Sequence, residues 1–148
     1  MTKIGFIGLG NMGSKMALNL LKSNYDVMGY DINKKFVENL LPYGLKKASD
    51  VVNISVDTDV VITMLPNGEI VEEVYDKIIN NFKPGTLLVD CSTIDVDKAK
   101  VIHQKCRPLF ALFQSMYVQQ IDILYKRFNG QCIDWQRLDG ILGIVPAN

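Results

Sequence analysis

The sequence predicts an α/β protein, a doubly wound and mainly parallel sheet with helices on both faces, from two observations. Along residues 3–104, short apolar runs alternate with segments whose apolar side chains recur at helical spacing. A glycine-rich hexapeptide, residues 8–13, joins the first apolar run to the first helical segment. Nearly continuous apolar strands connected by helices are typical of parallel sheets, because each crossover places a helix over one face.

The hexapeptide predicts a Rossmann-type dinucleotide site. Its six candidate cofactor-binding residues follow the first strand and are Gly8, Leu9, Gly10, Asn11, Met12 and Gly13. Gly8 permits a tight turn, Gly10 lets the backbone approach a pyrophosphate, and Gly13 lets the helix pack closely on the strand. Free N–H groups near Asn11 and Met12 then point at the anion, which the helix dipole favours. The alternative is a glycine-rich turn that binds no ligand.

An acidic residue, Asp31, closes the second apolar run at 27–30, about 20 residues beyond the glycines. Its carboxylate is placed to accept hydrogen bonds from a ribose 2′-hydroxyl. A 2′-phosphate would meet a like charge there, so NAD is the predicted cofactor and NADP is disfavoured. Lys34 and Lys35 lie just beyond and would partly neutralise a phosphate. The alternative interpretation is that both lysines are simply solvated residues in the first turn of a helix.

Capping and turn residues set the bounds of the other predicted elements. Asn24 tolerates the left-handed conformation and ends the first helix. Asn33 and Asp95 are predicted N-caps. The remaining elements are a helix between residues 33 and 42, a short helix at 49–55, a strand at 59–65, an amphipathic helix at 69–82, a strand at 86–91 and a helix from 95 to about 104.

Two further loops follow strands and are expected at the same edge of the sheet, where ligands bind in such folds. In the first loop, Pro66 makes a rigid lip and Leu65 lies against an apolar ring such as nicotinamide. The alternative interpretation of this loop is that Pro66 only ends the strand and Asn67 caps the next helix. In the second, Ser92 and Thr93 donate and accept hydrogen bonds to a carboxamide or ribose hydroxyl, and a simple turn at a helix start is the alternative.

Composition disfavours several classes of partner. The 16 basic and 16 acidic residues give no net charge, which disfavours nucleic acid and membrane surfaces. The cysteines Cys91, Cys106 and Cys132 are far apart and odd in number, so neither a disulfide framework nor a metal site is predicted. No apolar stretch is long enough to span a membrane, and no targeting segment precedes the first strand. A cytoplasmic location is therefore expected.

Three strings of residues together resemble a known family: IGFIGLGNMGSKMALNLLKSNYDVMGYD, DVVITMLPN and LLVDCSTID. In this order they are similar to the amino-terminal half of the β-hydroxyacid dehydrogenase family, in particular its 3-hydroxyisobutyrate dehydrogenase branch, over residues 3–104. The resemblance implies hydride transfer to NAD that oxidises a small 3-hydroxy acid to its semialdehyde, as in valine breakdown. Glyoxylate and tartronate semialdehyde reductases, which are also relatives, are an alternative, and 6-phosphogluconate dehydrogenases are larger relatives.

The resemblance also assigns residues to parts of the cofactor. It implies that the glycine-rich turn and Asp31 bind the adenosine and pyrophosphate part. It implies that Leu65, Pro66 and Thr93 contact the nicotinamide half. Eukaryotic members of the family are often mitochondrial, which leaves a mitochondrial location open.

The resemblance ends near residue 104. The family's substrate loop, catalytic lysine and helical second domain have no counterpart in residues 107–148, so we nominate no catalytic residue. We expect an NAD-binding domain at 1–106 and a divergent tail at 107–148, whose apolar stripe from Leu109 to Phe128 predicts an amphipathic helix. That helix packs on the sheet, pairs two chains as in a homo-oligomer, or belongs to a poorly folded extension. The chain is expected to be inactive alone, and a module that binds NAD without chemistry is the alternative.

Overall fold

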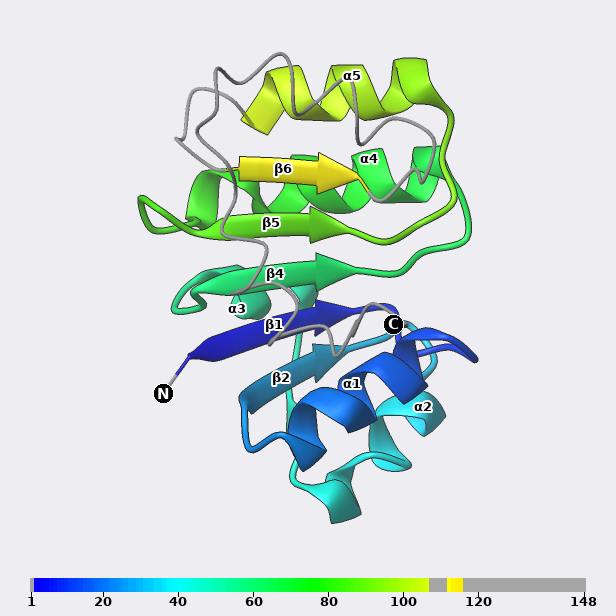
Figure 1. The fold of residues 1–148 in the computed structure, drawn as a ribbon, viewed down its shortest axis with the longest axis vertical. Coiled ribbons are helices and arrows are strands. Elements are labelled where there is room, and N and C mark those ends of the chain that lie inside the picture. Colours follow the sequence, from blue (N-terminus) through cyan, green and yellow to red (C-terminus); the bar gives the residue numbers. More distant parts are fainter. Residues whose placement is uncertain (1, 107–111, 116–148) are drawn as a thin grey trace, which may run out of the picture.

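The computed structural model describes residues 2–106 and 112–115 and contains a six-stranded parallel sheet (Figure 1). The strands are β1 (Lys3–Ile7), β2 (Asp26–Tyr30), β3 (Lys46–Lys47), β4 (Val60–Thr63), β5 (Leu87–Asp90) and β6 (Leu112–Ser115). They lie in the order β3-β2-β1-β4-β5-β6, and every neighbouring pair is parallel. The chain builds outward from β1 in both directions, which is the topology of a doubly wound sheet.

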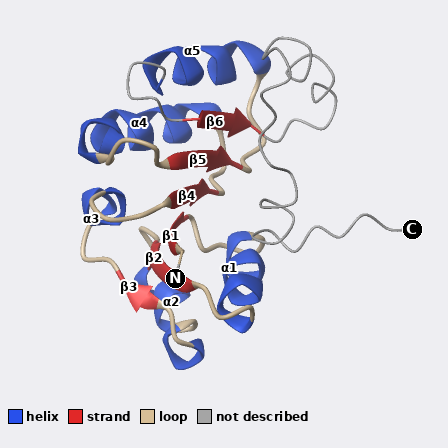
Figure 2. Ribbon diagram, turned by 60° about the vertical axis from the view of Figure 1, so that its left-hand side comes forward, coloured by secondary structure: helices blue, strands red, loops and turns tan. Residues whose placement is uncertain are grey.

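Helices cover both faces of this sheet. They are α1 (Gly13–Lys22), α2 (Lys34–Glu38), α3 (Val51–Ser55), α4 (Gly68–Ile78) and α5 (Val96–Cys106), with short 3-10 turns at Leu41–Tyr43 and Ile79–Asn81. Figure 2 shows α3 and α4 on one side of the sheet and α1 on the other, and α5 packs into the same core as α3 and α4. The predicted fold class is therefore confirmed. Within the described residues, no helix has the length and apolar character needed to cross a membrane.

Side chains that alternate along the strands build two separate cores. Ile4 and Phe6 of β1 are buried in the core that α1 and α2 cover, whereas Ile7 belongs to the core beneath α3, α4 and α5. In β4, Ile62 joins the first core and Val61 the second. Successive side chains of a strand point to opposite faces. A continuous apolar run therefore serves both cores at once, as expected for a parallel sheet.

Polar side chains begin and end the helices at the predicted positions. Asn24 follows α1 with φ 62°, in the left-handed region. The side chains of Asn33, Asn67 and Asp95 each accept a backbone N–H in the first turn of α2, α4 and α5, at 3.2, 2.9 and 2.8 Å. These bonds satisfy N–H groups that have no partner within the helix.

Two differences from the predicted elements lie between β2 and α3. Helix α2 ends at Glu38 rather than near Pro42, and a 3-10 turn leads to Gly44, whose φ is +96°. Pro42 has no N–H to donate to the Glu38 carbonyl, so the helical pattern of hydrogen bonds cannot continue through it. The sequence does not predict β3, because its two exposed lysines carry no apolar pattern. Only its pairing with β2 defines it as a strand.

The predicted tail helix is wrong at residues 112–115. These residues form β6, which pairs with β5 from Leu87↔Leu112 to Asp90↔Ser115. The edge of β5 offers unpaired N–H and C=O groups, and a strand can satisfy them where a helix cannot. The sheet thus extends beyond residue 106. The rest of the predicted helix, at 109–111 and 116–128, lies outside the described residues, as does Cys132.

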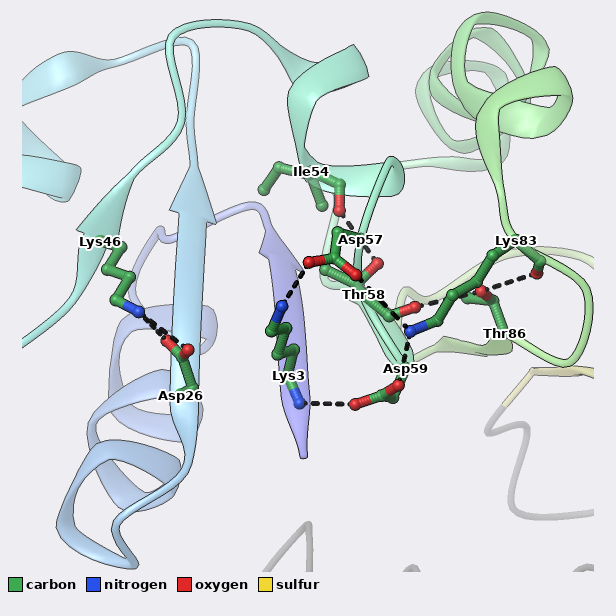
Figure 3. Close-up of polar contacts among 9 residues, drawn as sticks. All are labelled: Lys3, Asp26, Lys46, Ile54, Asp57, Thr58, Asp59, Lys83 and Thr86. Carbon is green, nitrogen blue, oxygen red and sulfur yellow. Dashed lines mark hydrogen bonds and ion pairs between the residues drawn. The ribbon is translucent and has the colours of Figure 1, made fainter. Parts of the chain in front are cut away.

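Ion pairs gather at the amino edge of the sheet (Figure 3). Asp59 accepts the Lys3 backbone N–H at 2.8 Å and the Lys83 ammonium at 2.7 Å, and the Lys3 ammonium pairs with Asp57. The hydrogen bond from Lys3 lowers the pKa of Asp57, and that from Lys83 lowers the pKa of Asp59. These side chains are largely exposed, so salt screens their attraction.

We expect Asp57→Asn to lower the urea midpoint at neutral pH, because it removes the charge that pairs with Lys3. A carboxyl with a lowered folded-state pKa stabilises the fold above its ordinary value of 3.8, and the contribution is lost as the pH falls through the folded-state value. The midpoints of the wild type and the variant should therefore converge below pH 3.8. They should also converge in about 1 M salt, where the Debye length is about 3 Å.

The control for this substitution is Asp50→Asn, since the Asp50 side chain makes no capping hydrogen bond. It removes the same charge from another exposed position. A difference between wild type and Asp57→Asn that persists at low pH and high salt would contradict the electrostatic explanation.

Candidate dinucleotide-binding site

The predicted site residues meet at one edge of the sheet, toward which the arrowheads of Figure 1 point. The turn after β1, the residue after β2 and the loops after β4 and β5 all follow the carboxyl ends of parallel strands. The order of strands reverses between β1 and β4. Crevices at such reversals are the ligand sites of open α/β sheets.

Two glycines of the turn are required by backbone packing. Gly8 has φ +93° and donates its N–H to Tyr30 O at 3.0 Å, and a Cβ there would lie 2.2 Å from Met64 O. A Cβ on Gly13, the first residue of α1, would lie 1.9 Å from Gly8 O. No real side chain approaches a carbonyl oxygen this closely. Helix α1 therefore packs directly on the end of β1, as the third glycine of the motif predicts.

Open space surrounds the middle glycine of the turn. A Cβ on Gly10 would meet no described atom within 4 Å, so a ligand can approach the backbone there. Asn11 and Met12 are exposed, and no side chain caps α1. Among the described residues, none accepts a hydrogen bond from the backbone N–H groups of residues 10–13. Such free N–H groups, at the positive end of a helix dipole, fit a pyrophosphate.

Asp31 connects the second strand to the glycine-rich turn. Its Oδ2 accepts the Leu9 N–H at 2.7 Å, and its Oδ1 accepts the Asn33 N–H at 2.8 Å. A carboxylate has about four acceptor positions, so about two are left for hydroxyl groups of a ligand. Sequence reasoning does not find the contact with Leu9, because the two residues are 22 positions apart and no local pattern links them.

The loop after β5 holds the loop after β4. Ser92 Oγ accepts the Leu65 N–H at 2.8 Å, and Ser92 is only 2% exposed. Ser92 therefore belongs to the interior and not to the ligand-facing surface suggested by its sequence position. Thr93 and Pro66 are exposed, and Leu65 is half-buried. The cap at Asn67 is also present, so this loop both ends a strand and begins a helix.

Buried polar side chains lie beneath these loops. Thr63 Oγ1 donates to Asp90 Oδ1 at 2.8 Å, and both residues are fully buried. Burial raises the pKa of Asp90, and burial raises the pKa of the Cys91 thiol to about 12. At neutral pH this thiol is protonated and is a poor nucleophile. In the part of the chain that the structure describes, no group of three His, Cys, Asp or Glu side chains is arranged to hold a metal ion.

Comparison with known proteins agrees with this geometry. Residues 3–113 match the family described as the NAD binding domain of 6-phosphogluconate dehydrogenase. A probable mitochondrial 3-hydroxyisobutyrate dehydrogenase of Dictyostelium discoideum is 39% identical over 102 residues, which cover 67% of this chain and 32% of that protein. An NAD-dependent L-serine dehydrogenase of Pseudomonas aeruginosa is 40% identical over 110 residues, which cover 72% of this chain and 37% of that protein.

Solved structures show the same likeness. The structure of Mycobacterium tuberculosis 3-hydroxyisobutyrate dehydrogenase with L-serine has a TM-score of 0.75 at 35% identity, over 78% of this chain and 40% of that chain. An imine reductase from Pseudomonas sp. shares the fold, with a TM-score of 0.72 at 21% identity. The chain thus spans about a third of the length of the curated relatives named above, 32% and 37%.

We expect Gly10→Ala and Gly13→Ala to differ in their effect on folding. A Cβ at Gly13 would collide with the Gly8 carbonyl, so Gly13→Ala should lower the free energy of unfolding by about 1–3 kcal/mol. A Cβ at Gly10 meets nothing within 4 Å, so Gly10→Ala should leave it close to wild type. Urea unfolding of both variants measures the difference. Equal destabilisation by the two substitutions would contradict the packing described for this turn.

Proposed function

Because the chain belongs to the family of the NAD binding domain of 6-phosphogluconate dehydrogenase, we propose that it binds NAD at the carboxyl edge of its sheet. We propose further that it is the cofactor-binding part of an oxidoreductase that transfers hydride between NAD and a small 3-hydroxy acid. The turn after β1 carries the proposal. Its central Gly10 stands in open space beside the free N–H groups at the start of α1.

In this proposal the adenosine ribose binds at Asp31. Each oxygen of its carboxylate accepts one backbone N–H and has acceptor capacity left for a ribose hydroxyl. A 2′-phosphate would bring a second negative charge to the same place, which typically costs several kcal/mol, so NAD is preferred to NADP. Lys34 and Lys35 are exposed in the first turn of α2, which supports their interpretation as solvated residues.

The rest of the cofactor then extends across the reversal of strand order. The pyrophosphate lies at the N–H groups of residues 10–13, and the nicotinamide half continues toward the loops after β4 and β5. There Leu65 presents an apolar side chain, and the Thr93 hydroxyl is exposed and able to bond a carboxamide. Pro66 makes the lip of the site, since its ring fixes the backbone.

When bound, NAD supplies the hydride acceptor, and the residues of this chain bind and orient it. The relatives named for 3-hydroxyisobutyrate and for L-serine support a 3-hydroxy acid as the substrate class, because both compounds carry a hydroxyl on carbon 3. Oxidation of that hydroxyl gives a semialdehyde. We assign no catalytic residue within residues 2–106 and 112–115. The cofactor-binding domain in this proposal corresponds to residues 1–106, together with β6.

Titration of the 148-residue chain with NADH and NADPH, followed by nicotinamide fluorescence, tests this proposal. We expect saturable NADH binding and NADPH binding weaker by about tenfold or more. Asp31→Asn should reduce the preference for NADH by about tenfold, because it removes the charge that repels a 2′-phosphate.

Two further variants serve as references in this titration. Gly10→Ala should weaken NADH and NADPH alike, because it fills space beside the pyrophosphate that both cofactors share. Asp57→Asn removes a carboxylate at the amino edge of the sheet, at the other end of the strands, and should change neither affinity. Equal affinity of the wild type for both cofactors would contradict the role of Asp31. A wild type that binds neither would contradict the proposed function.

We expect no oxidation of 3-hydroxyisobutyrate or L-serine by the purified 148-residue chain with NAD. Hydride transfer needs a held substrate and a general acid or base, and the resemblance implies neither in residues 107–148. NADH formation measured after removal of host dehydrogenases would contradict this expectation. Cofactor binding without turnover would support a chain that holds NAD but lacks the chemistry, alone or paired with a second chain.

A further inference from the structure

Asp90 is a fully buried carboxyl beneath the proposed cofactor edge. It is 0% exposed, and its Oδ2 accepts no hydrogen bond from any described residue. Acidic side chains are rarely fully buried, and an unpaired buried polar atom costs free energy. The preceding residues of β5, Leu88 and Val89, fill the two cores with apolar side chains. Core packing alone therefore does not explain a carboxyl at this position.

The other oxygen of Asp90 organises the loop after β5. Oδ1 accepts the Thr63 hydroxyl at 2.8 Å and the Ser92 N–H at 3.1 Å. The second of these bonds spans two residues, and a turn closed by such a side chain directs the backbone after a strand. Ser92 is held in the interior by this turn, and its Oγ lies 2.8 Å from Leu65 N. Thr63, Asp90, Ser92 and Leu65 are thus joined by a continuous series of hydrogen bonds.

This series of hydrogen bonds begins where the backbone pairing between β4 and β5 ends. Thr63 and Asp90 are the last pair in register. Beyond them, the Leu65 N–H bonds to a side chain, Ser92, and not to a strand. The Tyr75 hydroxyl of α4 lies 3.4 Å from Thr63 Oγ1 and closes the buried side of the arrangement. The Leu65 N–H is therefore held by Ser92, and the Ser92 N–H by Asp90.

We propose that Asp90, acting through Ser92, is the positioning residue that fixes Leu65 and the Pro66 lip at the nicotinamide end of the site. This inference rests on the proposed binding of NAD. Pro66 has no N–H, so Leu65 supplies the donor that holds the start of the lip. Neither Asp90 nor Ser92 forms a described hydrogen bond with the glycine-rich turn or with Asp31. Loss of either side chain should therefore weaken binding of the nicotinamide half and leave binding of the adenosine half unchanged.

A comparison of NADH with ADP-ribose isolates that end. ADP-ribose shares the adenosine and pyrophosphate of NADH but has no nicotinamide. We expect Ser92→Ala to raise the Kd for NADH roughly three- to tenfold, as for the loss of one hydrogen bond, and to leave the Kd for ADP-ribose unchanged. Asp90→Ala should have the same selective effect.

Conservative and matched variants separate positioning from general destabilisation. Asp90→Asn keeps the Oδ1 acceptor and places an amide where Oδ2 has no described partner, so it should retain NADH binding. Thr86→Val removes a buried hydroxyl that bonds Thr58 O and Lys83 O at the opposite edge of the sheet. It should cost comparable stability and leave both affinities unchanged. If Asp90→Ala does not fold, Ser92→Ala carries the test.

Exchange of the Leu65 amide hydrogen, measured by NMR in the ligand-free chain, reports the Ser92 contact without any cofactor. We expect faster exchange in Ser92→Ala at Leu65 and no change at Gly8, whose N–H bonds Tyr30 O. Equal weakening of both ligands, or no weakening of NADH, would overturn the positioning role alone. A wild type that binds neither ligand would overturn the proposed function and this inference together.

Discussion

The close packing of the glycine-rich turn against two neighbouring backbones is the constraint on which the rest of the site depends. Gly8 lies against Met64 at the end of β4, and Gly13 at the start of α1 lies against Gly8. A side chain at either position would separate β1 from its neighbours. The strand order reverses between the same two strands, β1 and β4. One turn therefore closes the fold and leaves the start of α1 open to a ligand.

Charges are distributed unequally between the two edges of the sheet. At the amino edge, Lys3, Lys83 and their carboxylates neutralise one another in ion pairs. At the carboxyl edge, Asp31 is bonded by backbone N–H groups, and the N–H groups that begin α1 have no described acceptor. The ion pairs around Lys3 and Lys83 and the groups able to bind a charged cofactor thus lie at opposite ends of the strands. Further ion pairs join α4 to α5, where Glu72 pairs with Lys98 and Lys105.

Asp31 combines two roles that a sequence motif treats as one. Its contact with Leu9 ties the end of β2 to the glycine-rich turn, and its remaining acceptor capacity is available for a ribose. A substitution intended to change cofactor preference would therefore also alter the backbone that faces the pyrophosphate. Recognition of the ribose and the shape of the turn are physically coupled through this carboxylate.

Residue patterns alone predict the alternating strands and helices, the sheet covered on both faces, the glycine-rich turn and the caps at Asn33 and Asp95. These depend on periodicity and on side-chain bonds within a few residues. The folded chain is needed to show that residues 46–47 and 112–115 are strands, that Asp31 bonds Leu9, and that Ser92 lies inside beneath Leu65. Each of these features joins residues that are far apart in the sequence. The bonding partner comes within reach only when the neighbouring strand has taken its place in the sheet.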